Sequence, residues 1–139
     1  MSEQLERFFA PHRRDFATAL KEIRAGRKRT HWMWYIFPQL RGLGHSPTAQ
    51  YYGIQDLHEA DAFLHDPYLG GSLTTISEAL LALETCRAGD VFDPPDDMKL
   101  RSCMTLFALA AGRDSVFHRV LDKYFDGRMD DVTLRLLGR

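Results

Sequence analysis

The stretch that organises the chain reads Arg29-Thr30-His31-Trp32-Met33-Trp34-Tyr35-Ile36-Phe37-Pro38-Gln39-Leu40-Arg41-Gly42-Leu43-Gly44-His45, and it contains both tryptophans. Its apolar residues follow neither the helical nor the strand period, so neither of its faces is exposed to solvent throughout. A basic cluster precedes it, made of Arg24, Arg27, Lys28 and Arg29. This combination of rings, imidazole and guanidinium groups can stack a planar ring and hold an anion, or it can form part of a core.

The length and composition are those of an ordinary globular protein. A chain of 139 residues fits a single domain, 1–139, with one core. The net charge of −1 argues against a large nucleic-acid-binding surface. No apolar run reaches the ~20 residues that a membrane span needs, and the N-terminus lacks a hydrophobic signal region. We therefore expect a cytoplasmic protein without a nucleic-acid or membrane partner.

Helix-capping signals recur along the rest of the chain. Ser46-Pro47 and Asp66-Pro67 each pair an N-cap residue with a proline at the first helical position. Asp56 stands three residues before Glu59, which is the spacing of a capping box. Asp114 is expected to cap a helix nearer the C-terminus. The loops between these signals are short, and the chain contains no internal repeat.

Residues 96–111 are apolar around most of a helical circumference, and Gly112 follows as a stop signal. The apolar members are Met98, Leu100, Cys103, Met104, Leu106, Phe107, Leu109 and Ala110. The pattern predicts an all-α, or nearly all-α, single-domain bundle of about six to eight helices around this buried helix. Only residues 32–37 have strand propensity. Pro11 is expected to interrupt the first helix or to open the next one.

Three stretches together resemble a bacterial family of unknown function whose members are often labelled "calpastatin". They are Arg24-Ala-Gly-Arg-Lys-Arg-Thr-His-Trp-Met-Trp-Tyr-Ile-Phe-Pro-Gln-Leu, Ser46-Pro-Thr-Ala-Gln-Tyr-Tyr-Gly-Ile and Pro95-Asp-Asp-Met-Lys-Leu-Arg-Ser-Cys-Met-Thr-Leu-Phe. The resemblance extends over nearly the whole chain. It implies no activity, and nothing in the chain resembles the polar inhibitor repeats of true calpastatin.

A second resemblance is to the NADAR (YbiA-like) N-glycosidases, small helical enzymes that act on ADP-ribose-type or riboflavin-precursor glycosidic bonds. It is carried by Pro47-Thr-Ala-Gln-Tyr-Tyr-Gly-Ile-Gln and by residues 99–107. The NADAR motif has a glutamate in the first of these helices, whereas this chain has Thr48, Ala49 and Gln50 there. The resemblance therefore implies a ligand of the ADP-ribose type but supplies no carboxylate at that position.

The start of the 96–111 helix combines charges of both signs with a hydroxyl group. Asp97 and Arg101 are four residues apart and can pair along the helix. Lys99 and Arg101 oppose the helix dipole, and with Ser102 they can instead cradle a phosphate. The sequence leaves both interpretations open.

Two further groups of residues favour structural interpretations. His58, Asp61 and His65 share one helical face with spacing that permits metal ligation, but a solvated outer face is the favoured interpretation. Cys86 and Cys103 are interpreted as buried, unreactive thiols. We expect neither a metal nor a cofactor.

The sequence favours a small helical protein with a pocket for a nucleotide-like or ADP-ribose-like ligand. Whether it is an enzyme is left open; if it is, we expect a hydrolase of glycosidic bonds, with His31, Asp96 and Asp97 as catalytic residues. The candidate ligand-binding residues are Arg29, Trp32, Trp34, Gln39, Arg41, His45, Gln50, Tyr51, Lys99, Arg101 and Ser102. The alternatives are a non-catalytic module that binds protein or nucleic acid through residues 24–45, and a helical protein with no ligand.

Overall fold

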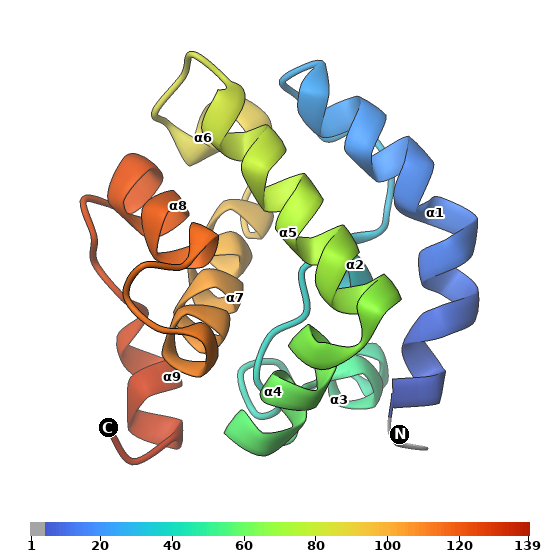
Figure 1. Ribbon diagram of the computed structural model, residues 1–139, viewed down its shortest axis with the longest axis vertical. Coiled ribbons are helices and arrows are strands. Elements are labelled where there is room, and N and C mark those ends of the chain that lie inside the picture. The colour runs from blue at the N-terminus through green and yellow to red at the C-terminus, as the bar shows by residue number, and fades with distance from the viewer. Residues whose placement is uncertain (1–4) are drawn as a thin grey trace.

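The computed structural model describes residues 5–139, which form an all-α fold (Figure 1). Nine helices occur in this range: α1 Glu6–Arg24, α2 Met33–Ile36, α3 Pro47–Tyr52, α4 Leu57–His65, α5 Pro67–Ala82, α6 Ala88–Val91, α7 Asp96–Ala111, α8 Val116–Phe125 and α9 Asp131–Leu136. The all-α prediction is confirmed. The helices outnumber the expected six to eight because α2 and α6, of four residues each, are too short to show a helical period.

Helix α7 is the buried helix that the sequence predicts at 96–111, and it packs against α4, α8 and α9. Figure 1 shows α5 running between α1 on one side and α7 and α8 on the other. The predicted core residues Met104 and Phe107 are both fully buried. Phe107 lies between Phe63 of α4 and Phe117 of α8, with ring centroids 5.4 and 5.8 Å away. Aromatic contacts from three helices therefore form the centre of the core.

Three predicted helix starts are confirmed by their capping bonds. The side chain of Ser46 accepts from the Ala49 backbone N–H, and that of Asp56 accepts from the Glu59 N–H. Asp66 likewise accepts two backbone N–H groups at the start of α5. The prediction for α8 was wrong by one residue. Ser115, rather than Asp114, caps that helix, because its Oγ accepts from the backbone N–H of His118.

Helix α1 continues through Pro11 without interruption, contrary to both alternatives that the sequence suggested. The helix buries residues on both sides of the proline, with Phe8 and His12 in its first half and Ala19 and Ile23 in its second. Burial of this long face offsets the backbone hydrogen bond that proline cannot donate.

The backbones of helices α4 and α5 are in close contact at Gly70. A Cβ atom added there would lie 2.0 Å from the backbone oxygen of Leu64, so only glycine fits. A Cβ on the neighbouring Gly71 would meet no atom within 4 Å. The two adjacent glycines therefore have different roles, and only the first sets how closely α4 and α5 pack.

The segment with strand propensity does not form a strand. Residues 33–36 form the single turn α2, and the chain then passes through a parallel bridge between Leu40 and Ile54. The backbone N–H of Arg41 donates to the Ile54 oxygen, and that of Ile54 donates to the Gln39 oxygen. This bridge holds the 39–46 loop beside α3. Within residues 5–139, no helix is long and apolar enough to cross a membrane.

Candidate functional site

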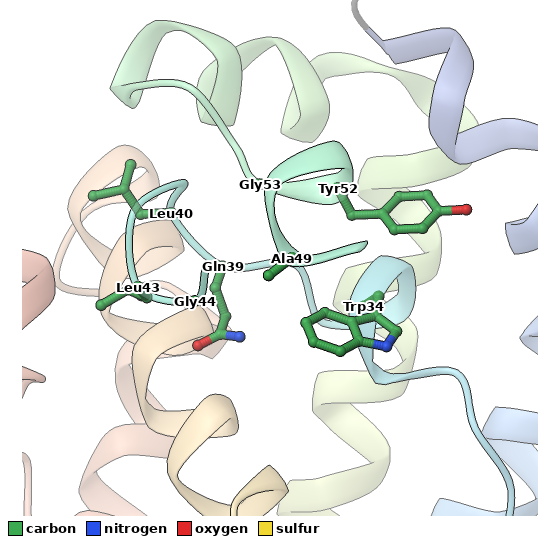
Figure 2. A pocket seen from close by; sticks show the side chains of 8 residues that line it. All are labelled: Trp34, Gln39, Leu40, Leu43, Gly44, Ala49, Tyr52 and Gly53. Atoms are coloured by element: carbon green, nitrogen blue, oxygen red, sulfur yellow. The ribbon is translucent and has the colours of Figure 1, made fainter. Parts of the chain in front are cut away.

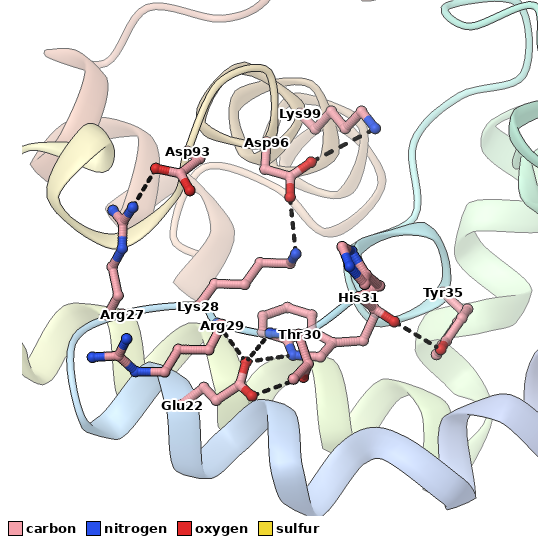
Figure 3. A network of polar contacts seen from close by, with 11 residues as sticks. Glu22, Arg27, Lys28, Arg29, Thr30, His31, Tyr35, Asp93, Asp96 and Lys99 are labelled. Atoms are coloured by element: carbon pink, nitrogen blue, oxygen red, sulfur yellow. Dashed lines mark hydrogen bonds and ion pairs between the residues drawn. The ribbon is translucent and has the colours of Figure 1, made fainter.

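Glu22, near the end of α1, fixes the beginning of the aromatic stretch. Its carboxylate accepts bonds from the backbone N–H groups of Arg29 and Thr30, from the Thr30 hydroxyl and from Trp32 Nε1 (Figure 3). Burial alone would raise the pKa of Glu22, but these hydrogen bonds outweigh it and hold that pKa below its usual value. The carboxylate thereby positions the chain that enters α2.

The two tryptophans have different environments. Trp32 is 1% exposed, and its ring belongs to the core beside Phe37. Its indole N–H is already bonded to Glu22 at 2.8 Å. Trp34 is only partly buried and borders a groove on the surface. The sequence left open whether the aromatic rings belong to the core or line a binding site. Trp32 belongs to the core, whereas Trp34 forms a wall of the groove.

The groove has a volume of about 410 Å³ and lies between the 39–46 loop, α3, the first turns of α7 and the start of α9. It is lined by Trp34, Gln39, Leu43, Gly44, His45, Ser46, Ala49, Pro95, Met98, Lys99, Ser102, Asp130 and Val132. The aromatic stretch and the helix start at 96–102, which both supply candidate ligand-binding residues, therefore lie together at this groove. Five of the candidate ligand-binding residues contribute to this groove: Trp34, Gln39, His45, Lys99 and Ser102.

The groove narrows beside Trp34 into a crevice of about 10 Å³ (Figure 2). Figure 2 shows the carboxamide of Gln39 and the methyl group of Ala49 close to the indole ring. Tyr52 and Gly53 close the crevice from the side of α3. Because about 10–15 Å³ are needed for one water molecule, a ring ligand does not fit here, and the wider part of the groove is the part open to a ligand.

An ion-pair cluster joins the first turn of α7 to the segment before α2 (Figure 3). The carboxylate of Asp96 lies 3.0 Å from Lys28 Nζ and 3.6 Å from Lys99 Nζ. Each lysine also lies over a tryptophan, Lys28 5.1 Å from the Trp32 ring centroid and Lys99 3.8 Å from that of Trp34. Lys28 was placed by sequence only in a basic cluster, and its partner is visible only in the fold.

The pair between Asp97 and Arg101, one of the two interpretations that the sequence left open, is not formed. Arg101 instead donates to the backbone oxygens of Arg128 and Met129, at 3.0 and 2.8 Å. Asp97 accepts from the backbone N–H of Met98. The loop after α8 offers Arg101 two carbonyl groups that the local spacing could not reveal. Arg101 thus holds the segment that leads to Asp130, rather than lining the groove itself.

The remaining candidates lie outside the groove lining. His31 and Arg29 are exposed, and Tyr35 donates a hydrogen bond to the backbone oxygen of His31 at 3.4 Å. Arg41 donates to the Gln50 backbone oxygen, and the Gln50 carboxamide donates to the His45 backbone oxygen at 2.9 Å. These two bonds brace the 41–50 loop. Tyr51 is 56% exposed and stands edge-on to the ring of Tyr52.

The two cysteines, both predicted to be buried, have different environments. Cys103 is buried as predicted, and burial raises the pKa of its thiol well above the usual value. Cys86 was predicted to be buried but is exposed, because it lies in the loop between α5 and α6 rather than on a helix. His58, Asp61 and His65 are exposed on the outer face of α4. No group of three or more His, Cys, Asp or Glu side chains within residues 5–139 could hold a metal ion.

Three contributors to this region could not be recognised as site residues from the sequence. Glu22 positions the aromatic stretch, Lys28 shares Asp96, and Asp130 closes one end of the groove. The Asp130 carboxylate accepts from the backbone N–H and hydroxyl groups of Thr133, so it also caps α9. The cap at Asp130 is local, because Thr133 lies three residues away, and Glu22 bonds residues seven to ten positions further along the chain. The contact of Lys28 with Asp96 joins segments that are distant in sequence, and no local motif marks it.

Comparisons with known proteins agree with this description and supply no activity. A family described as "Protein of unknown function (DUF1810)" matches residues 2–137. A crystal structure of the conserved hypothetical protein Rv1873 from Mycobacterium tuberculosis is similar, with 43% sequence identity and a TM-score of 0.94 over 98% of this chain and 97% of that chain. No curated protein matches.

Proposed function

The chain belongs to the DUF1810 family, whose function is unknown, and from that premise we propose that it binds a planar, nucleotide-like small molecule in the groove between Trp34 and α7. The observation that carries the proposal is the meeting of an indole ring and an ammonium group in that groove, with Lys99 Nζ 3.8 Å from the Trp34 ring centroid. The two residues come from segments that are far apart in sequence.

The dimensions and the lining support binding of a small molecule. Ligand sites in proteins typically have volumes of about 300–1,000 Å³ and combine an apolar lining with a few polar groups. The groove of about 410 Å³ has Leu43, Met98 and Val132 as apolar groups. Among residues 5–139 the Gln39 carboxamide has no hydrogen-bond partner, so it is available to a ligand. The hydroxyl of Ser102 is a further polar group in the lining.

A narrower version of this proposal is that the ligand contains a ribose. It rests on the likeness of residues 47–55 to the NADAR helix. In this chain that segment contributes Ala49 to the α3 side of the groove, next to the N-cap residue Ser46. Helix α3 carries no carboxylate, so the groups proposed for glycosidic-bond hydrolysis are His31, Asp96 and Asp97. Asp96 is held between two lysines, and binding is therefore the primary function that we propose.

The competing function, a protein- or nucleic-acid-binding module at residues 24–45, has less support. A module of this kind needs exposed basic and aromatic side chains. Arg27 is paired with Asp93, Lys28 is paired with Asp96, and Trp32 is in the core. Only Arg24 and Arg29 of the basic cluster are exposed.

The test is a thermal-shift screen against nucleotides, NAD-related compounds and flavin precursors. A ligand present at 100 times its dissociation constant should stabilise the fold by ~2.7 kcal/mol. Gln39→Ala should reduce the shift, whereas Gln55→Ala should leave it unchanged because Gln55 is exposed outside the groove. If no compound shifts the midpoint at millimolar concentration, or if Gln39→Ala responds like the wild type, the proposal is overturned.

A further inference from the structure

The indole of Trp34 is already covered by a side chain of the protein. Lys99 Nζ lies 3.8 Å from the ring centroid, which is the distance of a close cation–π contact. Atoms of a stacked planar ligand would lie at about 3.5–4.0 Å from the ring, because carbon atoms pack best at that separation. The ammonium group and a stacked ligand would therefore occupy the same space on this face. The crevice of about 10 Å³ beside the ring offers no alternative place.

Lys99 is the more weakly held of the two lysines that share Asp96. Its ammonium lies 3.6 Å from the carboxylate, whereas that of Lys28 lies at 3.0 Å (Figure 3). The side chain of Lys99 is 21% exposed and that of Lys28 is 10% exposed. If Lys99 turned away, Asp96 would still be paired with Lys28. The flexible stem of a lysine permits such a movement without a change in the backbone.

From this arrangement we propose that Lys99 is a displaceable cover of Trp34, and that the groove selects planar ligands carrying an anionic group. This inference rests on the proposed function and names the chemical class of its ligand. An anion gives the departing ammonium a charge-assisted hydrogen bond in place of the contact with the ring. A neutral planar ligand must displace the same ammonium without providing a new partner. Lys99 is then the residue that determines specificity.

The other charges around the groove fix where the anion binds. Asp130 lies at the α9 end, and Asp96 and Asp97 lie in the first turn of α7. The charge of Asp96 is balanced by Lys28, 3.0 Å away, whereas the carboxylate of Asp130 accepts from neutral groups of Thr133. A phosphate would therefore be repelled more strongly near Asp130 than near Asp96. The ligand's anionic group therefore lies toward Lys99 and the exposed His45, with its ring on Trp34.

The experiment compares two pairs of compounds that differ only by a phosphate: AMP with adenosine, and FMN with riboflavin. Affinities are measured by calorimetry for the wild type, for Lys99→Met, which keeps an unbranched side chain but removes the charge, and for Lys21→Met as a control, since Lys21 is an exposed lysine on α1. In the wild type we expect at least one phosphorylated compound to bind about tenfold or more tightly than its neutral partner. Lys99→Met should weaken the phosphorylated compound and strengthen the neutral one, and Lys21→Met should change neither.

A second readout locates the binding. Binding of the phosphorylated compound should change the tryptophan fluorescence of the wild type, and this change should be lost in Trp34→Phe, which retains Trp32. If phosphorylated and neutral compounds bind equally to the wild type, or if Lys99→Met keeps the wild-type preference, the inference on Lys99 is overturned while the proposed function stands. If no compound of either pair binds, the proposed function is overturned together with the inference.

Discussion

The middle and the first turn of helix α7 place their polar side chains in different environments. Its middle, from Cys103 to Phe107, is fully buried, and its only polar side chain there, Thr105, donates to the Arg101 backbone oxygen and accepts from the Asp130 N–H. Its first turn carries a carboxylate shared by two lysines at the edge of a groove. The comparison separates the part of the helix that stabilises the fold from the part that is available for binding. Variants that act on one part of the helix at a time distinguish these two roles.

The core half of α7 should be the more sensitive to truncation. Phe107→Ala removes a fully buried ring between Phe63 and Phe117 and should lower the free energy of unfolding by ~3–5 kcal/mol. Met98→Ala, in the first turn of the same helix, removes a side chain that is 45% exposed and should cost less than about 1 kcal/mol. Denaturant titration of the two variants measures both losses, and equal losses would contradict the comparison.

The stability of the core should also depend on His12 remaining uncharged. His12 is fully buried, with Nδ1 bonded to the Tyr68 hydroxyl at 2.9 Å, and burial lowers its pKa from 6.5 to about 4. Between these two pH values the unfolded chain takes up a proton that the folded chain does not, so stability falls as the pH falls. This one residue should account for a loss of up to about 3 kcal/mol, since each unit of pKa corresponds to 1.36 kcal/mol.

The control for this pH effect is His12→Phe, which preserves a ring stacked on Phe16. Unfolding titrations at pH 7, 5.5 and 4 should show a smaller acid-induced loss of stability in the variant than in the wild type. The comparison removes the contribution of other acids with lowered pKa values, such as Asp15 and Glu22, which both proteins share. If the free energy of unfolding depended on pH in the same way in both proteins, protonation of His12 would not destabilise the fold, and the prediction would be wrong.

Two adjacent glycines test how closely the core is packed. Gly70→Ala forces a methyl group onto the backbone oxygen of Leu64 and should destabilise the protein by ~1–3 kcal/mol or more through overpacking. Gly71→Ala has open space and lies within helix α5, so it should stabilise by up to about 1 kcal/mol. Thermal midpoints of the two variants should move in opposite directions, and a common direction would contradict the close approach of α4 and α5.

The same contrast explains what the sequence could reveal. The bounds of α7 follow from its apolar circumference and Gly112, and the starts of α3, α4 and α5 follow from Ser46, Asp56 and Asp66, because these signals are local. The different environments of Trp32 and Trp34 could not be predicted, since the stretch has no period that orients them. They depend on Glu22 and Lys99, which reach the rings from other helices.

The partners of the charged side chains at the groove edge could not be predicted from the sequence either. Local spacing offered Asp97 as the partner of Arg101, but the fold presents Arg101 with the carbonyl groups of Arg128 and Met129. It likewise brings Lys28 to Asp96 from the loop after α1. Long charged side chains have many partners within reach, and only the tertiary arrangement selects among them. The residues proposed for catalysis therefore need a test that separates chemistry from structure.

That test uses His31→Ala and Asp96→Asn. His31 is exposed, so His31→Ala should cost less than about 0.5 kcal/mol. Asparagine at position 96 can still accept a hydrogen bond from Lys28 but loses the charge that two lysines share, and the side chains of Lys28 and Asp96 are only 10% and 20% exposed, so Asp96→Asn should cost about 1–2 kcal/mol. The control is Asp93→Asn, which affects the exposed pair with Arg27 in the same region. If the two residues act as acid and base on a bound ribose, each variant should abolish turnover of a ligand found by the screen, and Asp93→Asn should turn over normally. His31→Ala should also leave the affinity for that ligand nearly unchanged. Normal turnover in both variants would show that Asp96 serves only to hold Lys28 and Lys99, and a large loss of thermal midpoint in both would assign them to the fold.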